Sequence, residues 1–422
     1  LIRKNHPGKI FFSYANTVTT IDFAKNFKGH GWVGIKFQLD PLEAYSEIIL
    51  HLRFKETDAK LQQETVGIIG TNLLHACFTQ NDPKIILKSL YDNLSKDQFE
   101  INMVEVVGPA FENIDNRLLS LTLVKERMTN AVIFTPDGVN QQPSDILYKK
   151  NILTMRGSFR PVTKVNIDML EKGLASFKEN KKVDEKDIQI LFEITLSNLK
   201  ADGEVNEQDF LDRVDILCSL GYTVMISNYR KFYKIIEYLS QFTKSRMGLI
   251  LGVDNLVDMF EEQYYRNLNG GIMEAFGIIF TRDIRFYLYP YKPTDNTGLL
   301  NSTNIPIHPR VKGLYNYLHS NGRIEDLNFN TNVLGIFSRE ILKRIRACEV
   351  GTWEDSVPHG VAEIIKEKQT TSYKKALNKL WFKIDTFEKI IAGEFWQIVD
   401  SNLSDNSIKW TTVNIAFKDI NA

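Results

Sequence analysis

The sequence has few cysteines and histidines, and they are scattered. Its 422 residues include three cysteines, Cys77, Cys218 and Cys348, none of them in a Cys-x-x-Cys or Cys-x-x-His unit. An odd, sparse and dispersed set argues against a disulfide framework and against a structural zinc site. The seven histidines show no paired metal-binding spacing. We therefore expect three buried thiols in a reducing compartment and no metal site.

An excess of charge and long apolar runs are also lacking. Lys plus Arg and Asp plus Glu number 52 each, whereas a dedicated nucleic-acid or anionic-membrane binder usually carries a basic excess. No apolar run reaches the ~18 residues that span a bilayer. Residues 1–7 are basic and polar, unlike a signal peptide. These absences predict a soluble, cytoplasmic protein without a membrane span or a nucleic-acid partner.

Complete catalytic motifs are missing too. The chain has no GxxxxGK[ST] phosphate loop and no GxSxG nucleophile elbow. The sequence therefore names neither a reaction nor a cofactor, and the search for a site has to start from the expected fold.

That fold is α/β. From residue 98 to 291, short strands that are apolar at nearly every position alternate with amphipathic helices. This pattern predicts a parallel sheet covered on both faces. A doubly wound sheet and a (β/α) barrel both fit, and the near-continuous alternation slightly favours a barrel-like closure. The predicted strands are 102–107, 131–135, 152–156, 188–196, 223–227, 247–253 and 284–289.

Four segments are expected in all, since 422 residues are too long for one ordinary domain. Residues 1–97 read as an N-terminal α+β domain, in which strands at 33–39 and 47–54 are spaced for a hairpin. After the parallel β/α domain at 98–291, residues 292–369 read as a linker and helical extension. Residues 370–422 form a C-terminal tail with amphipathic helix candidates and a possible protein partner. Three of the five tryptophans lie in this tail: Trp381, Trp396 and Trp410.

The most site-like string is RGSFRPVTK at 156–164, which follows a predicted strand. Ligands of parallel α/β folds meet the carboxyl ends of the strands, and arginine is a bidentate donor for phosphate or carboxylate. Arg156, Ser158, Arg160 and Lys164 are therefore the expected ligand-binding residues. The alternative is a polar loop whose arginines pair with local carboxylates.

Polar residues at neighbouring strand ends extend this prediction. Ser227 and Asn228 follow one strand and Asp254 follows the next, so all three would line the same mouth. Glu193 lies within an apolar strand, where a carboxylate is costly unless it is paired or functional. Glu193 and Asp254 are the catalytic candidates, with Glu193 as the general base. Side chains such as Asp254 at strand ends are, alternatively, helix N-caps.

Four strings carry a resemblance to a known family: RGSFRPVTK, ENIDNRLLSLTLVK, FLDRVDILCSLGYTVMISNY and HPGKIFFSYANTVTTIDFAKNF. They resemble a bacterial family whose members carry the automatic names nicotinate-nucleotide adenylyltransferase and TonB-dependent receptor, and the resemblance covers most of residues 1 to about 369. The first name implies an HxGH-type motif, which neither Asn5-His6-Pro7-Gly8 nor Gly29-His30-Gly31 matches. The second implies a large outer-membrane barrel, which helix-separated strands cannot form. No catalytic residue is carried over from the family.

Three functions follow as alternatives. The leading hypothesis is a soluble enzyme that binds an anionic small molecule, phosphorylated or carboxylated and in one version a nucleotide, at the carboxyl ends of the strands. Its rival is a non-catalytic interaction or regulatory protein with a degenerate ligand site. A metal-dependent hydrolase ranks last, because the acids are present but clustered histidines are not.

Overall fold

The computed structural model describes residues 2–5, 8–22, 28–181, 183–200, 203–293, 298–349 and 351–368, and two short strands at 395–398 and 415–418. The chain divides into two compact units. The first comprises Leu1–Ser158 and Leu170–Asn328, and the second comprises Phe159–Met169 and Phe329–Ala422. Within the described ranges, every helix is too short or too polar to cross a membrane.

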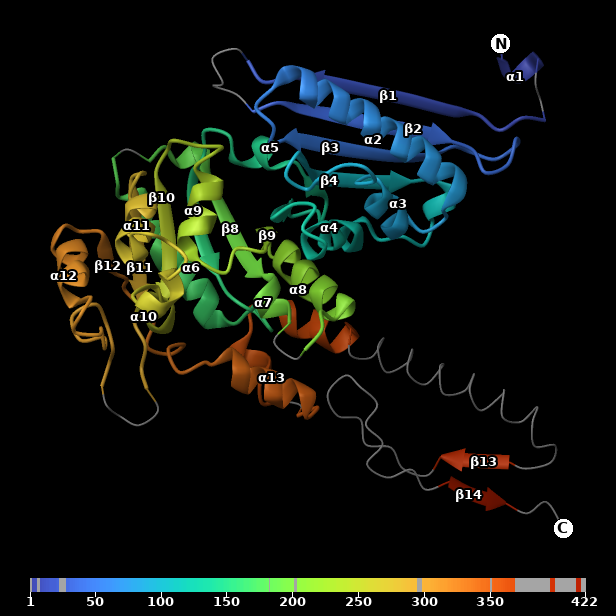
Figure 1. Cartoon of the computed structure of the whole chain (residues 1–422). Coiled ribbons are helices and arrows are strands. Elements are labelled where there is room, and N and C mark those ends of the chain that lie inside the picture. The colour runs from blue at the N-terminus through green and yellow to red at the C-terminus, as the bar shows by residue number, and fades with distance from the viewer. Residues whose placement is uncertain are drawn as a thin grey trace. The chain divides into compact units, whose positions relative to one another are not determined.

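The first unit begins with a four-stranded antiparallel sheet in the order β1-β2-β3-β4 (Figure 1). The expected hairpin is confirmed, since β2 and β3 pair from His30↔Arg53 to Phe37↔Ser46. One face of this sheet packs on α2, α3 and α4 through an apolar core that includes Ile35, Leu50 and Leu73. The elements are α1 (Ile2–Asn5), β1 (Phe12–Thr19), β2 (His30–Phe37), β3 (Ser46–Phe54), α2 (Ala59–Thr79), α3 (Pro83–Ser89), β4 (Phe99–Val107), η1 (Pro109–Phe111) and α4 (Asn116–Lys125).

The second sheet of this unit has eight strands in the order β12-β11-β10-β7-β8-β9-β5-β6. Strands β7 to β12 are parallel, and β5 and β6 are antiparallel to their neighbours. The chain is thus mixed α/β, as expected. The strands are β5 (Ala131–Phe134), β6 (Asn140–Gln141), β7 (Asn151–Arg156), β8 (Ile188–Thr195), β9 (Thr223–Ser227), β10 (Met247–Gly252), β11 (Ile284–Tyr289) and β12 (Ile324–Asp326).

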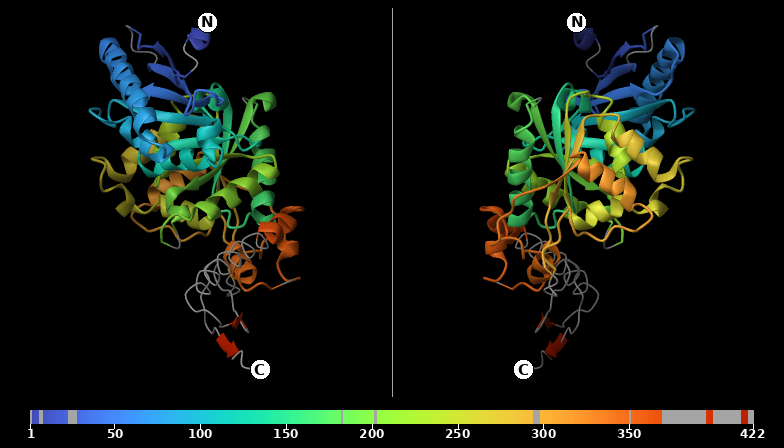
Figure 2. Two further views of the ribbon diagram at one scale, coloured as in Figure 1. Left: turned by 90° about the vertical axis from the view of Figure 1, so that its right-hand side faces the viewer. Right: turned by 90° about the vertical axis from the view of Figure 1, so that its left-hand side faces the viewer.

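Helices lie on both faces of this sheet (Figure 2). Along β10, Leu249 and Leu251 join one apolar core with α9 to α12, whereas Gly248 and Ile250 face α6. This alternation follows from the two-residue period of a strand. The helices are α5 (Pro143–Leu147), α6 (Lys164–Lys178), η2 (Glu185–Asp187), α7 (Leu196–Leu199), α8 (Glu207–Ser219), α9 (Phe232–Leu239), α10 (Val253–Met259), η3 (Glu262–Tyr265), α11 (Gly271–Ile279) and α12 (Lys312–Ser320).

Two strand assignments need correction. The strand expected at 102–107 in the parallel domain is β4, which pairs antiparallel with β3 in the first sheet. The strand expected at 131–135 is β5, which lies in the second sheet but runs antiparallel to β9. An apolar run shows that a strand is buried on both faces, but it carries no information on the partner or the direction of the strand.

The second unit contains α13 (Ser338–Arg346), η4 (Glu354–Ser356), a helical segment at 361–368, and the antiparallel pair β13 (Phe395–Ile398) and β14 (Ile415–Lys418). Apart from these two strands, the tail predicted at 370–422 and its possible partner surface lie outside the described residues. Cys348, expected to be buried, is exposed just after α13, whereas Cys77 and Cys218 are buried. Burial raises the pKa of Cys77 to about 12 and that of Cys218 to about 11.

Candidate ligand pocket at the carboxyl ends of the parallel strands

Arg156 and Glu193 form a buried ion pair where β7 and β8 end. The two residues are register partners on these neighbouring parallel strands. Arg156 donates from Nε to Glu193 Oε2 at 2.7 Å and from Nη2 to Oε1 at 2.8 Å. The Glu193 side chain is 1% exposed and that of Arg156 is 10% exposed. This is the bidentate geometry in which a guanidinium group holds a carboxylate most firmly.

Further contacts extend this pair to the third strand. The hydroxyl of Ser227, at the end of β9, donates to Glu193 Oε1 at 2.6 Å. Arg156 also donates to the carbonyl oxygens of Tyr229 at 2.8 Å and Arg230 at 3.3 Å, and its guanidinium carbon lies 4.3 Å from the centre of the Phe232 ring. The cluster therefore joins the ends of β7, β8 and β9 and fixes the loop that follows β9.

This bonding changes the expected roles of the three residues. Both carboxylate oxygens of Glu193 already accept hydrogen bonds, and Ser227 is fully buried. A general base needs a free lone pair within reach of the substrate. We therefore do not propose Glu193 as a general base. Arg156 pairs with the local carboxylate of Glu193. This is the arrangement expected from the sequence as the alternative to ligand binding.

A pocket of about 430 Å³ opens beside this cluster, at the carboxyl ends of four successive parallel strands. Its walls come from the residues that follow β7, β8, β9 and β10, and from η3. The lining residues are Arg156, Thr195, Ser197, Asn198, Arg230, Lys231, Phe232, Asn255, Asp258, Met259, Tyr264 and Tyr265.

Two adjacent cations, Arg230 and Lys231, distinguish this pocket. Neither has a carboxylate within ion-pair distance among the described residues; Arg230 Nε instead donates to Ser197 Oγ at 3.2 Å. The Lys231 ammonium lies 3.4 Å from the centre of the Tyr264 ring. Burial and the nearby Arg230 charge lower the pKa of Lys231. The fold thus holds together two like charges that repel each other.

Asp258 is the one acidic residue that lines the pocket. Burial and the neighbouring carboxylates of Asp254 and Glu261 raise its pKa. The polar side chains of Thr195 and Asn198, which also line the pocket, form hydrogen bonds with the local backbone. Thr195 Oγ1 accepts from the Asn198 backbone N–H at 3.2 Å, and Asn198 Nδ2 donates to Gly157 O at 3.0 Å. Because Glu193 neutralises Arg156, the lining leaves two cations, Arg230 and Lys231, against the one carboxyl group of Asp258.

Three other predicted site residues of the first unit, Ser158, Asn228 and Asp254, are not part of this lining. Ser158 is exposed, and its carbonyl oxygen accepts from Arg213 at 3.1 Å. Asn228 donates its backbone N–H to Asn130 O at 2.8 Å. Asp254 is exposed in the first turn of α10, where Gly252 and not Asp254 occupies the N-cap position.

Arg160 and Lys164 belong to the second compact unit, and Lys164 is exposed. Of the predicted ligand-binding residues, Arg156 alone lines the pocket.

Sequence reasoning missed the two cations that matter. Arg230 and Lys231 follow the strand TVMIS and precede an apolar helix, so the strand-end rule that selected Arg156 applies to them equally. Tyr264 and Tyr265 could not be found by the strand-end rule, because they do not follow a strand. They lie in η3, a short turn after α10 whose position depends on the packing of α10.

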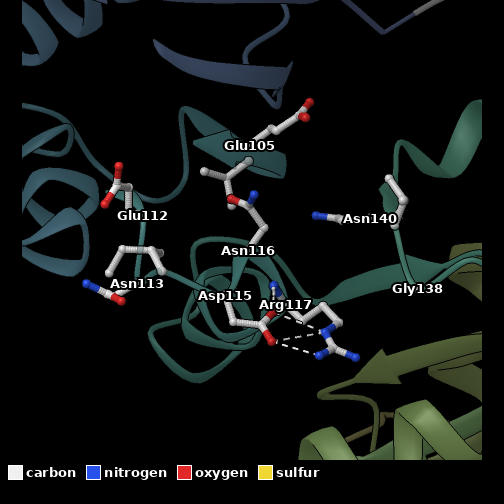
Figure 3. Close-up of a pocket in the computed structure, with 11 residues that line it drawn as sticks. Glu105, Glu112, Asn113, Asp115, Asn116, Arg117, Gly138 and Asn140 are labelled. Carbon is white, nitrogen blue, oxygen red and sulfur yellow. Dashed lines mark hydrogen bonds and ion pairs between the residues drawn. The ribbon is translucent and has the colours of Figure 1, made fainter. Parts of the chain in front are cut away.

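A larger hollow, of about 570 Å³, lies between β4, the start of α4 and the turn before β6 (Figure 3). The side chains at its centre, Asn116 and Arg117, already form hydrogen bonds and ion pairs within the chain. Asn116 accepts from the Val106 N–H at 2.8 Å and donates to the Val106 oxygen at 3.0 Å, as a neighbouring strand would. Arg117 pairs with Asp115 at 2.7 Å and with Asp215. These residues brace the edge of β4, and we do not assign a ligand here.

Within the described residues, no group of three or more histidines, cysteines or acids is arranged to hold a metal ion. In comparisons with known proteins, no family model and no curated protein matches the chain.

Proposed function

We propose that the protein binds a phosphorylated or carboxylated small molecule in the pocket that Arg230 and Lys231 line. The observation that carries this proposal is the pair of adjacent cations, neither of which has a carboxylate within ion-pair distance in the described structure; Asp258 acts on Lys231 only from a longer range. An anion between them would relieve their repulsion and form charge-assisted hydrogen bonds, which are about twice as strong as neutral ones. Helix α9 begins directly after Lys231 without a side-chain cap, so its N–H groups add positive potential.

The strand order supports this place in the fold. From β7 the chain adds β8 and β9 on one side, and later β10, β11 and β12 on the other. We infer a doubly wound arrangement rather than a barrel, with the reversal of order between β7 and β10. Ligands of such folds bind outside the carboxyl ends of the strands at this reversal. The pocket takes Arg156 from the end of β7 and Asn255 from the first turn after β10.

The size and the aromatic walls of the pocket suit a compact organic anion. Its volume of about 430 Å³ falls within the roughly 300–1,000 Å³ of small-molecule sites. Phe232 and Tyr264 offer ring faces, and Asp258 offers an acceptor for a ligand hydroxyl or amine. A nucleotide combines these features. We propose binding as the function and assign no reaction.

The test measures ligand binding by the wild-type chain and by Arg230→Gln and Lys231→Gln. A thermal-shift screen of nucleotides, sugar phosphates and carboxylic acids selects a ligand, because binding to the native state raises the melting temperature. Calorimetry then gives Kd. Each substitution removes a charged hydrogen-bond donor, and we expect it to weaken binding by roughly 10- to 100-fold.

The matched control is Lys234→Gln. Lys234 is an exposed lysine on the same helix that pairs with Glu237 at 2.8 Å and does not line the pocket. It should bind the ligand as the wild type does. If no compound raises the melting temperature, or if both pocket variants bind as tightly as the control, the proposal fails.

A further inference from the structure

A second cationic pocket lies at the opposite edge of the parallel sheet. Arg246 immediately precedes β10, Asp283 precedes β11, and Arg323 precedes β12, so this pocket collects the amino ends of three neighbouring strands. Its volume is about 400 Å³, and Phe280, Arg285 and Tyr317 also line it. A strand of six residues such as β10 separates the two edges by about 20 Å, at about 3.3 Å per residue. The pocket is therefore independent of the one proposed above.

Arginine dominates the charge of this pocket. Three arginines line it against one carboxylate, Asp283. That carboxylate is shared: Arg246 Nη1 lies 2.9 Å from Oδ2, and Arg323 Nη1 lies 3.4 Å from Oδ1. Arg285 pairs with Glu325 at the start of β12. With Glu325 included, three positive charges face two negative ones, and a net positive charge remains.

The arginines also have donors left over. A guanidinium group carries five N–H donors. Arg246 is 6% exposed, yet its Nε has no hydrogen-bond partner in the described structure. Burying a charged group with an unused donor is costly unless something compensates it. Arg323, by contrast, is 38% exposed in its side chain and lies over the Phe280 ring at 5.4 Å, which holds its planar group at the pocket mouth.

We propose that this second pocket binds a small anion, a phosphate or carboxylate group, through Arg323 and Arg285. Arg246 adds to the local positive potential, which the shared Asp283 carboxylate only partly offsets, and the exposed Tyr317 forms the rim. Bound there, the anion contacts the amino ends of β10 to β12, whereas the ligand of the first pocket contacts the carboxyl ends. The second pocket is thus a separate anion-binding site on the same sheet.

The test titrates the full chain with two probes in metal-free buffer: inorganic pyrophosphate for the phosphate class and citrate for the carboxylate class. Calorimetry gives Kd and stoichiometry for the wild type, Arg323→Gln and Tyr317→Glu. The second variant adds a repelling charge at an exposed position and removes no ion pair, so it tests the site even if Arg323→Gln folds poorly. We expect each variant to weaken binding of at least one probe by about tenfold or more.

Two further variants assign the binding event. Arg310→Gln removes an exposed arginine that does not line the pocket, and Lys231→Gln belongs to the first pocket. Both variants should bind the probe with the wild-type Kd in the binding step that Arg323→Gln weakens. Binding of one probe alone identifies the chemical class of the ligand. The proposal is overturned if neither probe binds the wild type, or if Arg323→Gln and Tyr317→Glu bind both probes like Arg310→Gln.

Discussion

The contact between Arg156 and Glu193 gives both residues a structural role rather than a ligand-binding or a catalytic one. Arg156 and Glu193 are nearly buried, and their charges are matched by two short hydrogen bonds and by the Ser227 hydroxyl. A buried pair of this kind contributes little net stability over an apolar pair of equal volume, but breaking it is costly because one charge remains uncompensated. Arg156 is therefore the wrong residue to mutate in a ligand-binding test.

We expect Arg156→Gln to lower the free energy of unfolding by about 3–5 kcal/mol, since it leaves the buried Glu193 carboxylate without its cation. Urea denaturation measures this loss. The matched control is Lys234→Gln, which breaks an exposed pair with Glu237 and should cost less than about 1 kcal/mol. The double variant Arg156→Met, Glu193→Leu should recover part of the stability, because it removes both charges but leaves the buried Ser227 hydroxyl without its acceptor. A loss for Arg156→Gln as small as that of the control would contradict the structural role of the pair.

At the scale of the element, the contact of α6 with β10 depends on a residue without a side chain. A Cβ at Gly248 would lie 2.8 Å from atoms of Leu153 and Tyr287 and 3.1 Å from Phe177. Phe177 of α6 and Tyr287 of β11 are fully buried and meet edge to face, with ring centres 6.2 Å apart. These rings cover β10 at Gly248, so the strand and the helix lie closer than two side chains would allow.

The substitution Gly248→Ala should therefore lower the free energy of unfolding by about 1–3 kcal/mol, because the added methyl group overpacks a core that has no room to yield. Thermal and urea denaturation measure the effect. Gly277→Ala, on α11, is the control, since its Cβ meets nothing within 4 Å. There the change should be neutral or stabilising, as alanine favours a helix. Equal stability of the two variants would show that α6 packs less closely than described.

At the scale of the whole first unit, the four-stranded sheet carries a cluster of polar side chains, His51, Asn102 and His30, on the face that does not pack on α2, α3 and α4. His51 is buried there, with Nδ1 2.6 Å from Asn102 Oδ1 and Nε2 3.3 Å from His30 Nδ1. On the same sheet, Arg53 lies over the Phe242 ring, just after α9, at 5.3 Å. Contacts of this kind connect the two sheets of the unit. Burial lowers the pKa of His51, and the nearby His30 and Arg53 act in the same direction.

This environment predicts a loss of stability in acid. Because the pKa of His51 is lower in the folded chain than its ordinary 6.5, the unfolded state binds more protons at mildly acidic pH. The free energy of unfolding is unaffected by His51 above pH 6.5 and falls as the pH drops from there toward the lowered pKa. Urea denaturation across this window should show a shallower slope for His51→Gln than for the wild type. His75→Gln, which changes an exposed histidine on α2, should keep the wild-type slope.

The sequence by itself determined most of the parallel strands and part of the candidate site, but it gave no sign of β1, β6 or β12. Alternating apolar runs and amphipathic helices gave the strands β7 to β11 nearly to the residue, because burial on both faces leaves a direct mark on composition. The spacing of residues 33–54 gave the β2–β3 hairpin, which is a local contact. The strand-end rule selected Arg156 and Ser227, since parallel neighbours end at one edge of the sheet, and Glu193 was selected as a carboxylate within an apolar strand.

Tertiary structure alone decided which strands are neighbours and which charges compensate each other. β4 joined the first sheet and β5 reversed its direction, although their sequences are as apolar as those of the parallel strands. Glu193 neutralised Arg156 across a separation of 37 residues, and Arg230 and Lys231 were left as the cations of the pocket. The physical reason is the same in each case. Side-chain chemistry fixes what a residue can bond to, but only the order and register of strands fix what lies within bonding distance.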